Sequence, residues 1–383
     1  MQVIPALGSG GVEIETLEIG RAIASAGGRS LIAADLSYWG GESLPAEIEF
    51  INLPLNTKNP FRISKNSNLI KDLIKKEGVN LVHVRSRSPA WSAYKATRAL
   101  GIPFITTHHA TYRSKSILKT FYNSVMVRGD RVIAISQFMA DHIMKIYKKS
   151  SWFDPKKISL IHRGVDCHFF DPSTISKERL AHLKKSWELK PETRLILLPG
   201  RISRNKGQDV LIKALSLMNH SDATIVFVGS AQGHENLRDT LLKQAASFDL
   251  EGRVKWMPPC PDLPAAFQLA DVIVCPSLVP EGFGRVIAEA LSMKKPIIAS
   301  NIGAPRELIE DGKTGWLTPP GDAVTLAKTL DHVLDLSEKQ LNKMGELGRK
   351  RALSDFSKET MCSETIALYV DVLKARDSVT TFD

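Results

Sequence analysis

The sequence predicts an α/β protein built from two doubly wound domains, each with a parallel sheet. The length of 383 residues exceeds one ordinary domain. Short apolar runs alternate with segments of helical periodicity along the chain, as in βαβ units. This pattern starts again after a polar stretch of mixed charge at residues 173–193. We therefore expect an N-terminal domain at 1–178, a C-terminal domain at 179–356, and a final helix within 357–383 that can pack back on the first domain.

The predicted strands are short and several are apolar throughout, which is typical of strands covered on both faces. In the first half they lie at 3–7, 30–34, 81–84, 104–107 and 131–135. In the second half they lie at 194–198, 224–228, 254–257, 272–275 and 296–300. Helical periodicity is clearest at 12–26, 207–218, 237–248, 285–292 and 323–334. Because such sheets bind ligands at their carboxyl edges, two facing domains would share one interdomain cleft.

The composition favours a protein of a reducing compartment without a structural metal. The four cysteines form no Cys-x-x-Cys pair and no cluster with histidine at zinc spacing. The first residues resemble a strand rather than a signal peptide, and no apolar run approaches the ~18 residues of a membrane span. We expect a cytoplasmic protein that is at most peripheral on the inner face of the membrane.

The net positive charge arises entirely from the first half of the chain. Residues 1–180 carry 25 Lys and Arg against 15 Asp and Glu, whereas the remainder carries 26 of each sign. Such a field favours an anionic partner, although a solvated lysine-rich face would look the same. Apolar residues at helical spacing form an amphipathic segment, namely Ile117, Leu118, Phe121, Tyr122, Val125 and Met126, and Arg113, Lys115, Lys119 and Arg128 flank it. A core-facing stripe would explain the segment, but its charge favours an anionic membrane surface, and nucleic acid is not expected.

Two loops of the second half carry the strongest chemical signals. Glu281 and Glu289 flank a loop with Gly282, Phe283 and Gly284 that enters a helix, an arrangement that offers backbone N–H groups to an anion and a carboxylate to hydroxyls. Residues 200–207 follow another strand and gather Arg201, Arg204 and Lys206, whose charges suit a diphosphate. A capping loop with a solvent-facing glutamate and a solvated basic loop are the alternatives.

The first half offers weaker signals. A glycine-rich turn with Gly10 and Gly11 joins the first strand to a helix but lacks the full dinucleotide fingerprint. His108 and His109 follow the strand at 104–107, at a sheet edge where function is common although most such histidines are structural. The sequence contains no Asp-x-Asp triplet, so we expect no metal ion and no other cofactor.

Together these residues resemble the retaining family-4 glycosyltransferases with the GT-B fold. The resemblance covers nearly the whole chain and adds the segments 133–136, 164–166, 300–307 and 311–315. It departs from many members at Gly303-Ala304 and at Arg306. It implies that Arg201 and Lys206 neutralise the donor diphosphate, that Glu281 holds sugar hydroxyls with the amides of Phe283 and Gly284 nearby, and that Glu289 binds the ribose. His109 would approach the donor sugar from the other domain, and Gly10 and Gly11 would lie near the donor phosphates.

The function expected from this resemblance is metal-independent, retaining transfer of a hexose from a nucleotide sugar to a glycan or glycolipid, in lipopolysaccharide or cell-envelope polysaccharide synthesis. One alternative is a non-catalytic protein of the same fold that binds sugar nucleotides or glycans. The retained Arg201, Lys206, Glu281 and Glu289 argue against it. A dinucleotide-dependent oxidoreductase is a weaker alternative, because it would need the full glycine fingerprint and an acid/base pair for hydride transfer.

Overall fold

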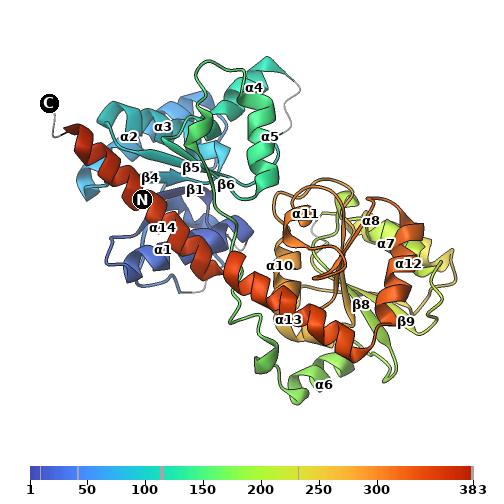
Figure 1. Cartoon of the computed structure of the whole chain (residues 1–383). Coiled ribbons are helices and arrows are strands. Elements are labelled where there is room, and N and C mark those ends of the chain that lie inside the picture. Colours follow the sequence, from blue (N-terminus) through green and yellow to red (C-terminus); the bar gives the residue numbers. More distant parts are fainter. Residues whose placement is uncertain (9, 41–42, 113–115, 232, 381–383) are drawn as a thin grey trace. The chain divides into compact units, whose positions relative to one another are not determined.

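The computed structural model describes residues 1–383 except 9, 41–42, 113–115, 232 and 381–383. The chain forms two compact units (Figure 1). Unit 1 comprises Met1–Gly164 and Lys358–Asp383, and unit 2 comprises Val165–Ser357. Each unit is built on one sheet whose strand pairs are all parallel. The predicted α/β class with two doubly wound sheets is therefore confirmed.

Unit 1 has a seven-stranded sheet, within the described residues, in the order β3-β2-β1-β4-β5-β6-β7. Its strands are β1 (Gln2–Ala6), β2 (Leu31–Asp35), β3 (Glu49–Asn52), β4 (Val82–Val84), β5 (Phe104–His108), β6 (Arg131–Ala134) and β7 (Ile158–Leu160). Its longer helices are α1 (Gly11–Ser25), α2 (Pro60–Glu77), α3 (Arg87–Leu100), α4 (Ile117–Asn123), α5 (Gln137–Tyr147) and α14 (Lys358–Thr380). The strand order reverses between β1 and β4.

In the described part of unit 2, a six-stranded sheet has the order β10-β9-β8-β11-β12-β13. Its strands are β8 (Arg194–Pro199), β9 (Ala223–Val228), β10 (Val254–Met257), β11 (Val272–Cys275), β12 (Ile297–Ser300) and β13 (Trp316–Thr318). Its helices are α6 (Lys177–Ser186), α7 (Gln208–Leu215), α8 (Glu235–Ala246), α9 (Leu263–Leu269), α10 (Arg285–Ser292), α11 (Pro305–Leu308), α12 (Ala323–Leu334) and α13 (Glu338–Asp355). Here the order reverses between β8 and β11.

The division between the units falls after Gly164, whereas the sequence suggested a boundary after residue 178. Hydrogen bonds tie the intervening segment to unit 2. The N–H of Val165 donates to the carbonyl of Phe356 (2.8 Å), and the Ser292 hydroxyl donates to the carbonyl of Phe170 (2.7 Å). The polar stretch 173–193 is not a linker, because it contains the surface helix α6, which packs on α9.

The last helix packs on unit 1, against α1. Its Met361, Tyr369 and Val372 join Ile19 of α1 in one buried apolar cluster. The Tyr369 hydroxyl also lies 2.5 Å from Nδ1 of His83, a fully buried residue of β4. Residues 358–380 therefore complete the core of the first unit, although unit 2 separates them from it in sequence.

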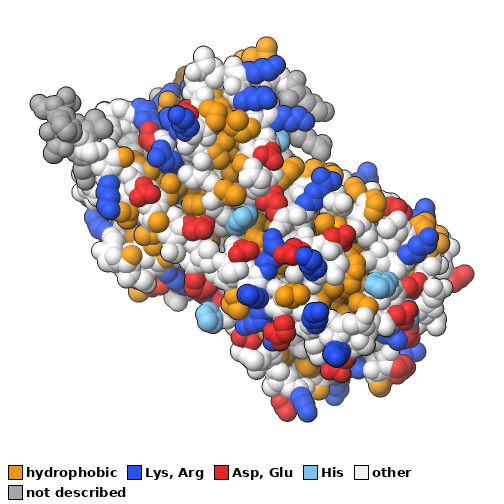
Figure 2. Space-filling model, in the orientation of Figure 1, with side chains coloured by type: hydrophobic (Ala, Val, Ile, Leu, Met, Phe, Trp, Pro, Cys, Tyr) orange, Lys and Arg blue, Asp and Glu red, His pale blue; other side chains and the backbone are white. Residues whose placement is uncertain are grey.

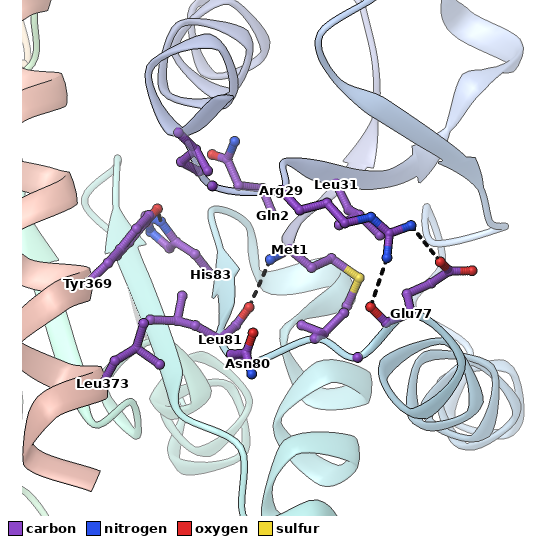
Figure 3. Close-up of a pocket in the computed structure, with 14 residues that line it drawn as sticks. Met1, Gln2, Arg29, Leu31, Glu77, Asn80, Leu81, His83, Tyr369 and Leu373 are labelled. Atoms are coloured by element: carbon purple, nitrogen blue, oxygen red, sulfur yellow. Dashed lines mark hydrogen bonds and ion pairs between the residues drawn. The ribbon is translucent and has the colours of Figure 1, made fainter. Parts of the chain in front are cut away.

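A cavity of about 220 Å³ lies at the amino edge of the unit 1 sheet (Figure 3). The backbone ammonium group of Met1 donates a hydrogen bond to the carbonyl of Leu81 (2.8 Å), and Arg29 forms an ion pair with Glu77 (2.7 Å). The predicted site residues do not line this cavity, because they follow the carboxyl ends of the strands.

Candidate functional site

The loops that follow β8 and β11 meet in unit 2 where the strand order reverses. The N–H of Leu278 donates to the carbonyl of Asn205 (2.8 Å). Gly207 has φ +69°, and a Cβ there would lie 2.0 Å from the carbonyl oxygen of Pro276. The close approach of the two loops therefore requires glycine at this position. A reversal of strand order is where open α/β sheets bind ligands.

Lys206 and Glu281 form an ion pair across these two loops. The Lys206 Nζ lies 2.7 Å from Oε1 of Glu281, and the Ser277 hydroxyl donates a hydrogen bond to the same oxygen. The side chains of Lys206 and Glu281 are 35% and 21% exposed, so a ligand has access to both. The structure thus brings together two predicted site residues, and it adds Ser277, which no motif in the sequence indicated.

The pair holds both groups in their charged forms. Burial alone would raise the pKa of Glu281, but the charge and hydrogen bond of Lys206, together with the hydrogen bond of Ser277, hold this pKa below its ordinary value. Burial likewise opposes the charge on Lys206, but Glu281 raises the pKa of the lysine above its ordinary value. Exposed Arg201 is close enough for its charge to act against that of Lys206. The site therefore holds two cations and one carboxylate.

The glycine-rich loop delivers Glu281 to the start of α10. Gly284, with φ +99°, precedes the first residue of the helix, and a Cβ there would lie 3.9 Å from Oε2 of Glu281. Gly282 is half-buried, and Phe283 is buried against Phe356 with ring centroids 5.8 Å apart. The N-terminus of α10 thus presents backbone N–H groups beside the carboxylate, a favourable place for an anion.

Glu289 lies further along α10 and is buried. Its Oε1 is 3.4 Å from Nε of Arg285, one helical turn earlier.

Glu281 is also held through its backbone, because the N–H of Ala304 donates to its carbonyl (3.1 Å) and a bridge pairs it with Gly303. The segment 300–307, noted in the sequence through the resemblance, therefore supports the position of Glu281.

In unit 1, Gly10, Gly11 and His109 follow the carboxyl ends of β1 and β5. Arg163 Nη2 donates to the carbonyl of Gly11 (2.6 Å), and its Nε lies 2.8 Å from Oε2 of Glu15. His109 Nδ1 lies 3.8 Å from the same carboxylate oxygen. Glu15 and Arg163 were missed in the sequence, because they are 148 positions apart and belong to no joint motif.

His109 is a neutral imidazole at physiological pH. Burial lowers its pKa to about 3, the nearby Glu15 carboxylate opposes this shift, and the charges of Arg163 and Arg85 add to it. A group with such a pKa carries no proton to donate as an imidazolium, so its chemistry is that of a neutral hydrogen-bonding ring.

Among the residues that the structure describes, no group of three or more His, Cys, Asp or Glu could hold a metal ion.

Replacing His109 by Gln should make the protein less sensitive to acid. The unfolded imidazole binds its proton near pH 6.5, whereas the folded one binds it only near pH 3. The unfolded state therefore holds more protons in this window, and wild-type stability falls as the pH drops below 6.5. The free energy of unfolding in urea should fall by about 1.4 kcal/mol per pH unit more in wild type than in H109Q between pH 6 and 4. Equal slopes for the two proteins would contradict a buried neutral His109.

Two family models match the chain, one in each half. Residues 9–169 match the model described as Glycosyltransferase Family 4, and residues 181–351 match Glycosyl transferases group 1. The crystal structure of a glycosyltransferase from Rickettsia africae ESF-5 is 35% identical with a TM-score of 0.89, and the alignment covers 97% of this chain and 98% of that one.

Two further similarities are more distant. The D-inositol 3-phosphate glycosyltransferase of Salinispora tropica is 25% identical over 312 residues, which are 76% of this chain and 63% of the relative. The structure of Anabaena Alr3699/HepE in complex with UDP-glucose has a TM-score of 0.79 at 21% identity, and the alignment covers 96% of this chain and 98% of that one.

Proposed function

Because this chain is a glycosyltransferase of family 4 with the GT-B fold, we propose that it moves a hexose from a nucleotide sugar to a glycan or glycolipid with retention of anomeric configuration. The observation that carries the proposal is the Lys206–Glu281 ion pair at the strand reversal of unit 2. It sets a cation suited to a diphosphate beside a carboxylate suited to sugar hydroxyls.

Each predicted donor residue has a physical task in this proposal. Lys206 and Arg201 neutralise the diphosphate, with help from the backbone N–H groups at the start of α10. Glu281 accepts hydrogen bonds from hydroxyls of the hexose, and Glu289 accepts them from the ribose. His109, which the proposal places against the donor sugar, is neutral and so adds no charge beside the reacting carbon.

Transfer with retention then proceeds on one face of the sugar. The bond between C1 and the phosphate oxygen breaks while the acceptor oxygen bonds to C1 from the same side. The acceptor proton passes to the departing phosphate oxygen, so no protein base is consumed. The transition state carries growing negative charge on the diphosphate, which Lys206 and Arg201 stabilise in place of a metal ion.

The main rival is a protein that binds the same nucleotide sugars without transferring them. It would show donor binding without product, whereas an oxidoreductase would respond to NAD(P). An envelope acceptor such as the lipopolysaccharide core suits the positive first half, because such glycolipids carry phosphates. UDP-hexoses are the first donors to test, since HepE binds UDP-glucose.

Transfer should be visible by proton NMR with UDP-, GDP- and ADP-hexoses and a phosphorylated lipid-linked acceptor. One α-linked donor should give an α-linked product, in the presence of EDTA. Glu281→Ala should reduce the rate by at least about a hundredfold, since it removes the contact to the hexose. Lys339→Ala, at an exposed cation of the same unit, should not. A β-linked product would refute retention, and activity restored only by Mn²⁺ would refute metal-free transfer.

The proposal includes docking on an anionic membrane through α4. Ile117, Leu118 and Phe121 are 88%, 82% and 59% exposed, whereas Val125 and Met126, from the same predicted amphipathic segment, are buried in the core. Arg113 and Lys115 lie outside the described residues. In Figure 2, hydrophobic and basic side chains lie next to one another on the part of unit 1 that carries α4 in Figure 1.

Arg128 supplies a cation to this apolar surface. Its guanidinium lies 4.3 Å from the ring centroid of Trp152, which is 43% exposed, and 5.6 Å from that of Phe121. Aromatic rings beside a basic group are typical of contacts with lipid headgroups. Within the described residues, no helix is long and apolar enough to cross a bilayer.

Replacing Ile117 and Leu118 by Glu should weaken vesicle binding by about tenfold or more, because both changes remove apolar insertion and add negative charge. Sedimentation with phosphatidylglycerol vesicles measures the effect, and phosphatidylcholine vesicles should bind wild type weakly. The matched control is Val324→Glu, at an apolar residue of α12 that is 52% exposed. Equal binding by wild type and the double variant would remove α4 from the docking surface.

A further inference from the structure

One buried carboxylate stands between the two predicted site elements of unit 1. Glu15 lies in α1, and its side chain is 5% exposed. Its Oε1 accepts a hydrogen bond from Arg85, and its Oε2 lies 2.8 Å from Nε of Arg163 and 3.8 Å from Nδ1 of His109. The carboxylate therefore has charged or polar neighbours from three other segments of unit 1.

Arg163 links Glu15 to the glycine-rich turn. Its Nη2 donates to the carbonyl of Gly11 at 2.6 Å. A Cβ on Gly11 would lie 2.9 Å from that same nitrogen, so the guanidinium packs directly on the turn. Arg163 can hold this geometry only while its own charge is balanced, because an unpaired buried guanidinium is strongly unfavourable.

His109 is the second element that faces Glu15. Both ring nitrogens are buried, and neither makes a hydrogen bond to any residue that the structure describes. A distance of 3.8 Å is too long for a hydrogen bond, and a ring movement of about 1 Å would bring Nδ1 within reach of Oε2. Since the ring is neutral, it carries one proton, and the carboxylate attracts that proton to Nδ1. Nε2 is then an acceptor for a hydroxyl.

We propose that Glu15 is a positioning residue for donor binding: through Arg163 it holds the Gly10–Gly11 turn, and it fixes the Nδ1–H tautomer of His109. The inference rests on the proposed function, in which the turn and His109 contact the donor. A purely structural role would be limited to balancing the charges of Arg85 and Arg163. The two roles differ in what they predict for a protein in which Glu15 and Arg163 are both replaced by neutral residues.

Three variants separate the roles: Glu15→Gln, Arg163→Met and the double variant. E15Q leaves buried Arg85 and partly buried Arg163 without their carboxylate, so its melting temperature should fall, and the double variant should regain the part of that loss that comes from Arg163. The positioning role predicts that kcat stays about tenfold or more below wild type in both proteins that lack Glu15. R163M alone should raise KM for UDP-glucose, or for the donor found in the transfer assay, with a smaller effect on kcat.

The tautomer of His109 is read by ¹⁵N NMR of the ring, without any turnover. Wild type and R163M should show the Nδ1–H form, free and with UDP added, and E15Q should lose that preference. An Nε2–H ring in wild type, or a double variant that regains both stability and kcat, would overturn the inference. If no nucleotide sugar is transferred by wild type, the proposed function fails, while the NMR result still decides whether Glu15 sets the tautomer.

Discussion

The Lys206–Glu281 ion pair depends on the parallel sheet of unit 2 and in turn organises the candidate site around it. The two residues are 75 positions apart, and they meet because β8 and β11 are neighbours where the strand order reverses. Gly207 allows the loops to approach, Ser277 bonds the carboxylate of Glu281, and the backbone at 303–304 bonds the backbone of Glu281. Each partner keeps the other charged, so the site has a cation and an anion ready before a ligand arrives.

The ion pairs around Glu15 in unit 1 are more deeply buried than the Lys206–Glu281 pair of unit 2. Glu15 is almost completely buried and balances buried Arg85 and partly buried Arg163, whereas the pair in unit 2 is more exposed. A buried network of this kind fixes geometry at a considerable desolvation cost. An accessible pair can exchange its partner for a ligand at lower cost. The buried network of the first unit is suited to fixing geometry, and the accessible ion pair of the second is suited to receiving a ligand.

Much of the fold could be predicted because buried parallel strands give continuous apolar runs in the sequence. The strands β3, β7 and β13 were not predicted, because they are edge strands of three or four residues. Their sequences lack the long apolar runs of the central strands. The division of the units after Gly164 differs from the predicted boundary after residue 178, because hydrogen bonds to the segment 165–178 come from residues more than a hundred positions away.

The candidate site was predictable to the extent that its residues share a loop. Glu281, Gly284 and Glu289 form a local motif, and Lys206 lies in a basic loop after a strand. Glu15, Arg85 and Arg163 come from separate segments of the first unit, and each looks like an ordinary surface charge in the sequence. Only the folded structure shows that Arg85 and Arg163 share the buried carboxylate of Glu15.

The most direct test of the roles of Lys206 and Glu281 compares the binding of UDP and UDP-glucose to Lys206→Met and Glu281→Gln by calorimetry. If Lys206 binds the diphosphate and Glu281 the hexose, K206M should weaken both ligands by about tenfold or more. E281Q should weaken only UDP-glucose, and because it frees the lysine, UDP should bind at least as well as to wild type. Equal losses of both ligands in both variants would contradict this division of roles, as would unchanged binding in K206M.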